Sequence, residues 1–184
     1  MTATEDKVKF NLKNAHYAIW DATTKKFLTP VAVPGSVSLS MDPQGDVTPE
    51  YADGIVYYTT TANQGYSGDW ELERVTDQMR QDIWGDTLNT DGVLVENANT
   101  EPKTFALLFQ IDGDQAGRDM VLYNCTATRP SVGGATNNET KQFTHDTCTI
   151  TAVPMSDGKV KAATTATTTD AIKTAWFDSV YVGA

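Results

Sequence analysis

The stretch YYTTTANQGYSGDWELE (57–73) ends in the clearest strand pattern of the chain. Trp70 and Leu72 alternate with three acidic residues, and successive side chains of a β-strand point to opposite faces. These acidic residues are Asp69, Glu71 and Glu73. A strand over 66–75 would therefore bury Trp70 and Leu72 and expose the acids. The preceding ANQG contains turn-forming residues, so we expect a hairpin between 55–61 and 66–75.

Alternation of apolar and polar residues recurs along the rest of the chain. Further strands are expected at 16–20, 27–33, 36–41, 93–96, 103–111, 120–128, 142–155 and 158–162. Most of these segments follow one another with no helical pattern between them. Such an order favours a mainly β fold, an antiparallel β-sandwich or partial barrel.

One α-helix is expected to flank the strands, at about 77–84. Thr76 suits the N-cap position and Gly85 the position just after the helix. Met79 and Ile83 lie four residues apart, which places them on one apolar face. A second, short helix is expected in DAIKTAWFDSV near the C-terminus.

The length of 184 residues suits a single domain with extensions. We expect an N-terminal arm at 1–14, a β domain at 15–162, and a C-terminal linker and arm at 163–184. Within the domain, 42–54 contains two prolines and two glycines. It is expected to form a long loop, and loops of this length are usually functional or mobile. A second loop is expected at 130–140.

Acidic residues dominate the middle of the chain. The net charge is −10, and residues 42–101 hold 13 acidic residues against two basic ones, Arg74 and Arg80. The remainder has 12 basic and 11 acidic residues and is nearly neutral. A protein that grips phosphates needs a basic face, and this chain shows none. The acidic segment would repel DNA, bind cations, meet a basic partner surface, or simply keep the protein soluble.

The cysteine content and the N-terminus indicate the compartment. Cys125 and Cys148 both lie in expected strands. The N-terminal MTATEDKVKF has no apolar core of a signal peptide, and no stretch approaches 18 apolar residues. We therefore expect assembly in a cytoplasm, with free, buried thiols and no membrane contact.

No catalytic or metal-binding motif is complete in the sequence. Asp112 and Asp114 begin a calcium-loop pattern, but the twelfth position is Tyr123 rather than glutamate. His16 and His145 have no partner at zinc-site spacing. The chain also lacks a G-x-S-x-G elbow, a P-loop and a dinucleotide motif. We expect no enzyme activity, cofactor or metal; a hydrolase using carboxylates of 42–101 is an alternative without a motif.

Aromatic residues around the predicted hairpin suggest a different class of function. Tyr57, Tyr66 and Trp70 would stack on sugars if they shared a surface. A carbohydrate-binding β-sandwich of a virion or cell surface is therefore the main alternative. One of Tyr57 and Tyr58 is expected in the core, because neighbouring strand residues face opposite ways.

Several segments, taken in order, resemble a known family. They are VPGSVSLSMDPQGD, YADGIVYYTTTANQGYSGDWELE, TDQMRQDIWG, DGVLVE, FALLFQIDGD, YNCTATRP and AWFDSVYV. Together they are similar to the major tail protein, the tail tube subunit, of long-tailed bacteriophages with non-contractile tails. The resemblance implies two packed antiparallel sheets with a flanking helix, a fold similar to that of the type VI secretion tube protein.

The same resemblance implies an assembly role. Tail tube subunits form hexameric rings that stack into a hollow tube, and DNA passes through it without specific binding during ejection. The implied partners are further copies of the chain and the tape measure, tail terminator and distal tail proteins. The implied location is the virion tail, after assembly in the host bacterial cytoplasm.

The resemblance also implies which residues contact neighbouring subunits. Segments 42–54 and 59–66 match the stacking loops, and both termini match contact arms, although the Thr-rich 163–170 has no assigned role. The expected contact residues are Asp42, Asp46, Glu50, Tyr51, Asp53, Asn63, Gln64 and Tyr66. The acidic residues expected to face the lumen or a subunit interface are Asp69, Glu71 and Glu73.

Overall fold

The computed structural model describes residues 5–136 and 143–183. Its architecture is mainly β, with antiparallel pairing throughout, as the sequence predicted. The longer strands are β1 (Lys9–Asp21), β4 (Ser36–Gln44), β5 (Val47–Ala52), β6 (Ile55–Thr61), β7 (Gly65–Leu72), β10 (Phe105–Gly113), β11 (Arg118–Ala127) and β12 (Asp146–Ala152). The short strands are β2 (Lys26–Phe27), β3 (Val31–Ala32), β8 (Thr87–Leu88), β9 (Leu94–Val95) and β13 (Lys161–Ala163).

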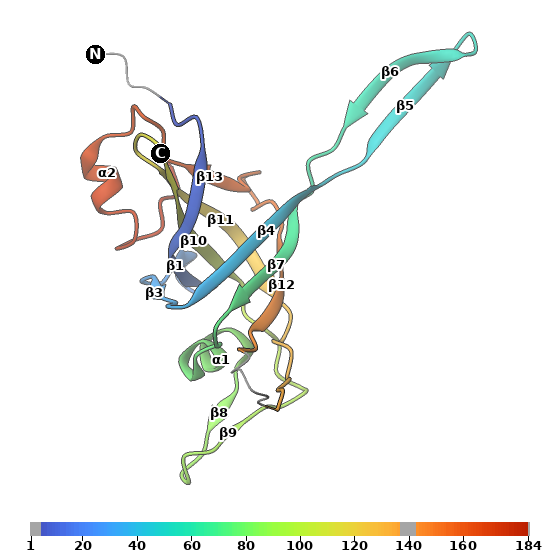
Figure 1. The fold of residues 1–184 in the computed structure, drawn as a ribbon. Helices are drawn as coiled ribbons and strands as arrows, with labels where there is room; N and C mark the ends of the chain where they lie inside the picture. Colours follow the sequence, from blue (N-terminus) through green and yellow to red (C-terminus); the bar gives the residue numbers. More distant parts are fainter. Residues whose placement is uncertain (1–4, 137–142, 184) are drawn as a thin grey trace.

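Nine of these strands form one sheet. Its order is β2-β1-β10-β11-β12-β7-β4, with β3 added to β1 and β13 added to β11. The sheet curls so that β4 approaches β1 across a shared core, as Figure 1 shows, without closing into a barrel. The pairs β5-β6 and β8-β9 are separate two-stranded ribbons that extend from this body (Figure 1).

The central strand β10 has apolar side chains on both faces. Phe105, Leu107 and Phe109 point into the concavity of the curled sheet, and Ala106 and Leu108 point to its outer face. Strands that are covered on both sides read as continuous apolar runs, which is why FALLF does not alternate. The molecule therefore has two cores, one on each side of the central strands.

The helix α1 (Asp77–Trp84) covers one end of the inner core. Its bounds match the sequence prediction, and the Oγ1 of Thr76 accepts a hydrogen bond from the amide of Met79 at 3.2 Å. Met79, Ile83 and Trp84 are fully buried against the sheet. A cavity lies at the opposite end of the concavity.

The segment after β13 covers the outer core. It includes the short helix α2 (Asp170–Thr174) and places Trp176 among buried side chains of β1, β10 and β11. The hydroxyl of Tyr123 donates a hydrogen bond to the carbonyl of Tyr181. The described part of the predicted C-terminal arm, 163–183, is therefore packed against the body.

The N-terminal prediction was wrong for residues 9–14. These residues belong to β1 and pair with β10, from Lys9 opposite Gly113 onward. Asp6 accepts hydrogen bonds from the amides of Gln115 and Ala116, which fixes the chain just before the strand. Long-range pairing of this kind has no local sequence signal, because the segment alone reads as polar and mixed in charge.

The prediction of a long loop at 42–54 was also wrong. Most of it is strand: the end of β4, then β5, which pairs with β6. The turn between them is Asp53–Gly54, and both residues have positive φ, 51° and 76°. An Asp-Gly turn of this type favours a tight two-residue hairpin. Residues 55–61 therefore pair with 47–52, not with 66–75 as expected.

The β5–β6 ribbon continues the hairpin formed by β4 and β7. The amide of Ala62 donates to the carbonyl of Asp46 at 3.0 Å, and the amide of Gln64 to that of Gln44 at 2.9 Å. At Gly45 a Cβ atom would lie 1.9 Å from the carbonyl oxygen of Ala62, so only glycine fits this junction. We call residues 46–62 the arm; it projects far from the body in Figure 1.

Candidate assembly interface

The arm carries apolar side chains with no core beneath them. Every residue of the arm is exposed except Ala52, and the side chain of Tyr57 is 74% exposed. Its exposed large apolar residues are Val47, Tyr51, Ile55, Val56, Tyr57 and Tyr58. An isolated two-stranded ribbon is marginally stable in water. An apolar ribbon exposed on both faces is typical of a segment that another chain covers.

The whole chain exposes more surface than a compact protein of its size. Its accessible area is 11853 Å² for a mass of 20.0 kDa. A compact monomer of that mass exposes about 8,700 Å². The excess is larger than the area that a standard protein interface buries, about 1,600 Å². The shape therefore leaves ample surface for association.

The structure groups only part of the predicted contact residues. Asp46, Glu50, Tyr51 and Asp53 all lie on the arm. Asn63 and Gln64 lie at its root, where the Oδ1 of Asn63 accepts a hydrogen bond from the amide of Gly65 at 3.1 Å. Asp42 lies on β4, and Tyr66 lies on β7 beneath the Nζ of Lys161, which is 4.5 Å from the centre of its ring.

Tyr57 and Tyr58 were not among the contact residues predicted from the sequence. Tyr57 and Tyr58 were expected on opposite sides of a strand with one in the core, yet both are exposed. The expectation was wrong because β6 pairs only with β5 and covers nothing on either face. The Asp53–Gly54 dipeptide between apolar runs was the signal that would have revealed the ribbon.

A second surface lies on the outer face of β4, β7 and β12. Trp70 and Leu72 are fully buried, as predicted, so the alternate residues of β7 point outward. The register places three short polar residues of each strand side by side on this face. They are Ser38, Ser40 and Asp42 on β4, Ser67, Asp69 and Glu71 on β7, and Thr147, Thr149 and Thr151 on β12. We call these nine residues the acidic sheet face.

The acidic sheet face contains hydroxyl and carboxylate groups but no lysine or arginine. The hydroxyl of Thr149 donates to Asp69 at 2.8 Å, and that of Ser38 donates to Glu71 at 2.9 Å. These cross-strand bonds hold the carboxylates in place on the sheet. A surface of this kind presents fixed negative charge without a group that would hold a phosphate.

His145 borders the acidic sheet face. Its Nδ1 lies 3.0 Å from Glu71, and its Nε2 lies 3.5 Å from Glu73. The hydrogen bond from His145, aided by the one from Ser38, lowers the pKa of the Glu71 carboxyl below its usual value. Glu71 is therefore held in its charged form.

The aromatic residues of the carbohydrate alternative do not share a surface. Trp70 is fully buried, and its Nε1 donates to the hydroxyl of Ser36 at 3.2 Å. Tyr57 lies on the arm, whereas Tyr66 is half-buried on the body. Trp70 thus cannot stack on a sugar, and the three-residue site expected from the sequence is wrong.

The residues considered for metal binding or nucleophilic catalysis have structural roles instead. Asp112 pairs with Lys13 at 2.7 Å, and Asp114 accepts a hydrogen bond from the amide of Lys7 at 2.6 Å. Within residues 5–136 and 143–183, no three His, Cys, Asp or Glu side chains cluster as metal ligands. Cys125 and Cys148 are free and buried, as expected, and burial raises their pKa to about 12 and about 11.

The chain was compared with protein-family models, curated proteins and solved structures. No protein-family model matches the chain, and no curated protein matches it. Among solved structures, it is similar to the tube-terminating cap of the anti-feeding prophage, determined by cryo-EM. The two share 12% sequence identity and a TM-score of 0.48, over 90% of this chain and 98% of that one. The described part of the chain contains no helix with the length and apolar character needed to cross a membrane.

Proposed function

We propose that the chain is a structural protein of the virion tail, the subunit of a tail tube that self-assembles into stacked, hexameric rings. The observation that carries this proposal is the arm, which extends from the body with apolar side chains on both faces. The segment resemblance to tail tube subunits supports it independently.

The arm gives association its driving force. Burying its six large apolar side chains on another chain would contribute on the order of 10 kcal/mol, before the cost of association is subtracted. Another chain would also cover the faces of the ribbon that are now exposed to water. Assembly through the arm would explain why the chain has an extension that contributes no side chain to its own core.

The acidic sheet face suits the wall of a channel for DNA. Phosphates bind to lysine and arginine, and a conduit with such groups would slow the passage of DNA. Asp42, Asp69 and Glu71 on this face would instead repel the backbone. Glu73 lies just beyond β7, beside the same His145, and adds to the negative charge.

Ring formation has a natural site at β4. This strand pairs with β7, and no other described strand pairs with its second edge. An open strand edge is a template for pairing with another chain. Pairing between subunits at this edge would place the acidic sheet faces of neighbouring subunits next to one another, around a common channel.

The wider role follows from the resemblance. We propose that the assembled tube contacts the tape measure, tail terminator and distal tail proteins, and conducts DNA during ejection without specific binding. Assembly would take place in the host bacterial cytoplasm, and the product would belong to the virion tail.

The test compares the wild-type protein with an arm variant, Tyr57→Lys/Tyr58→Lys, by sedimentation velocity over a range of concentrations. We expect the wild type to form large assemblies and the variant to stay monomeric. The matched control is Ala22→Lys/Thr23→Lys, which adds the same charge to an exposed turn of the body, and it should assemble like the wild type. A wild type that remains monomeric at every concentration would contradict the proposal.

A further inference from the structure

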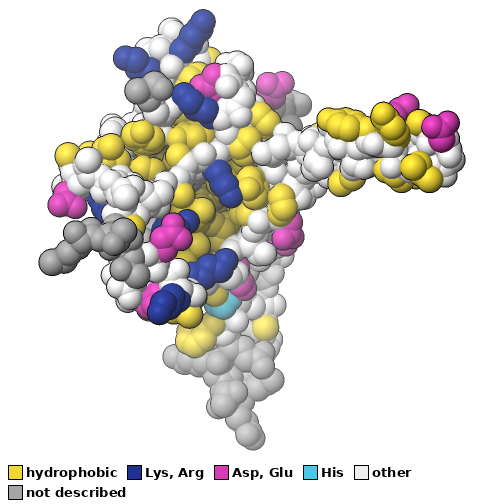
Figure 2. Space-filling view, turned by 90° about the horizontal axis from the view of Figure 1, so that it is seen from above, with side chains coloured by type: hydrophobic (Ala, Val, Ile, Leu, Met, Phe, Trp, Pro, Cys, Tyr) yellow, Lys and Arg dark blue, Asp and Glu magenta, His cyan; other side chains and the backbone are white. Residues whose placement is uncertain are grey.

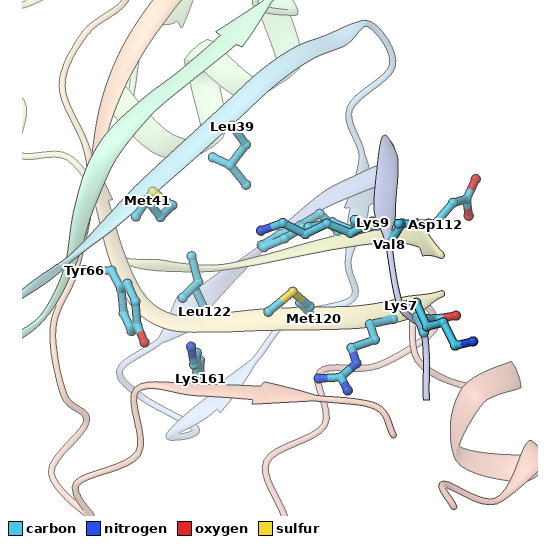
Figure 3. Close-up of a pocket in the computed structure, with 14 residues that line it drawn as sticks. Lys7, Val8, Lys9, Leu39, Met41, Tyr66, Asp112, Met120, Leu122 and Lys161 are labelled. Atoms are coloured by element: carbon cyan, nitrogen blue, oxygen red, sulfur yellow. The ribbon is translucent and has the colours of Figure 1, made fainter. Parts of the chain in front are cut away.

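An apolar cavity of about 610 Å³ opens at the end of the curled sheet opposite α1. Figure 3 shows side chains of β4 and β11 facing each other across it. The apolar residues around it include Leu39, Met41, Phe109, Ile111, Met120 and Leu122. Leu39, Met41 and Met120 are only partly buried, although they belong to the edge of the inner core. Two flexible methionine side chains make such a surface adaptable to an incoming segment.

The rim of this cavity is basic. Lys7, Lys9, Arg118 and Lys161 line it, and all four are exposed. Within the described ranges, none of them forms an ion pair within 4.0 Å. Figure 2 shows the apolar floor from above, with lysine and arginine side chains around it.

The two acidic residues at the rim are already engaged within the chain. Asp6 accepts hydrogen bonds from backbone amides at 2.7 Å and 2.9 Å, and Asp112 pairs with Lys13 at 2.7 Å. Asp112 also accepts a hydrogen bond from the side chain of Asn11. With four basic side chains against two acidic ones, the net charge around the cavity is positive.

The arm has the complementary character. It contains Asp46, Glu50 and Asp53 and no basic residue, and its remaining exposed side chains are largely apolar or threonine. Figure 2 shows acidic side chains near its outer end and apolar ones along its length, whereas Asp46 lies at its root. The arm leaves the body along β4 and β7 and points away from its own cavity, so it cannot fill that cavity (Figure 1).

We propose that the cavity receives the arm of a second copy of this chain. The apolar side chains of the arm would cover the open floor, and its carboxylates would meet the basic rim. The contact joins two different surfaces, so each subunit offers one arm and one cavity, and the interaction continues from copy to copy. This inference rests on the proposed function and specifies the partner surface of the arm.

Reciprocal charge reversal tests the pairing. Lys7→Glu/Lys9→Glu/Lys161→Glu alters the rim, and Asp46→Lys/Glu50→Lys alters the arm; all five positions are exposed. At low salt we expect each variant alone to raise the concentration needed for assembly at least tenfold. The chain that carries all five changes should regain much of the wild-type behaviour. If the combined variant assembled even less well than either single set of changes, as independent effects would predict, the proposal would be overturned.

Photo-cross-linking locates the contact directly. Benzoylphenylalanine at position 57 should cross-link, in assembled protein, to peptides that contain Met41 or Met120 of another copy. The same probe at the exposed Leu28 of the body is the control and should not reach them. Cross-links from position 57 to a different surface, in protein that still needs the arm to assemble, would overturn this inference and leave the proposed function standing. Failure of the wild type to assemble would overturn both.

Discussion

The Nη1 of Arg129 lies 2.7 Å from the Oδ1 of Asp86, whose side chain is only 3% exposed. The same guanidinium donates to the carbonyl of Trp84 at 3.3 Å and pairs through Nε with Glu96 at 3.1 Å. Arg129 thus joins the end of α1 and the β8–β9 hairpin to the residues that follow β11. A single arginine fixes this end of the inner core.

Replacing Arg129 with alanine should destabilise the protein by about 3 kcal/mol, because it leaves the buried Asp86 carboxylate without its partner. Urea unfolding at neutral pH measures the effect. The matched control is Arg74→Ala, which removes an exposed ion pair with Asp77 and should cost less than about 0.5 kcal/mol. Equal losses in the two variants would contradict the structural role assigned to Arg129.

Trp70→Ala should lower the free energy of unfolding by about 3–5 kcal/mol, because the indole is fully buried in the inner core. Tyr58→Ala, in the arm, should change the stability of the monomer by less than about 0.5 kcal/mol. Measurements at concentrations below assembly separate folding from association. A large loss in the monomer on Tyr58→Ala would show that the arm packs on its own body.

The thiols of Cys125 and Cys148 should be unreactive in the native protein. Burial raises the pKa of Cys125 to about 12 and that of Cys148 to about 11, so neither is ionised at pH 8. A colorimetric thiol reagent should detect no thiol in the folded protein and two after denaturation in urea. Rapid reaction of one thiol under native conditions would place that cysteine outside the core.

Ionisation of Glu71 should make the free energy of unfolding depend on pH in the acid range. Its pKa is lowered in the folded protein, so its contribution is present above about pH 4.5, its ordinary pKa, and is lost as the pH falls through the lowered value. His145→Ala removes the main cause, and the pKa of Glu71 should move up towards its ordinary value. Carbon NMR titration of the Glu71 carboxyl measures this shift; an unchanged pKa in the variant would exclude His145 as the cause.

The sequence predicted the parts of the fold that depend on local patterns. Alternation at Trp70 and Leu72 identified a strand and its buried face, and the caps at Thr76 and Gly85 fixed the helix between them. These signals reside in a few neighbouring residues, so one sequence suffices to read them. The cysteines are free and buried, as expected from the predicted cytoplasmic setting.

The errors concern pairing between distant segments. Residues 9–14 read as a polar arm because their partner strand lies about a hundred residues away. Segment 42–54 read as a loop because its prolines and glycines outweighed the Asp53–Gly54 turn signal. Strand propensity assumes a half-buried surface, and the arm has no such surface within its own chain. The cavity and its basic rim could not be predicted from the sequence either, because Lys7 and Lys161 come together only in the folded sheet.

A cryo-EM map of the purified protein at high concentration, or with a tail-assembly initiator, would show whether the chain assembles into a tube. We expect closed rings stacked into a tube, with Asp69 and Glu71 facing the channel and the arm of each subunit in contact with a neighbour. Protein that stays monomeric under all these conditions, and is absent from virion tails, would contradict this expectation. So would a tube whose acidic sheet face points outward.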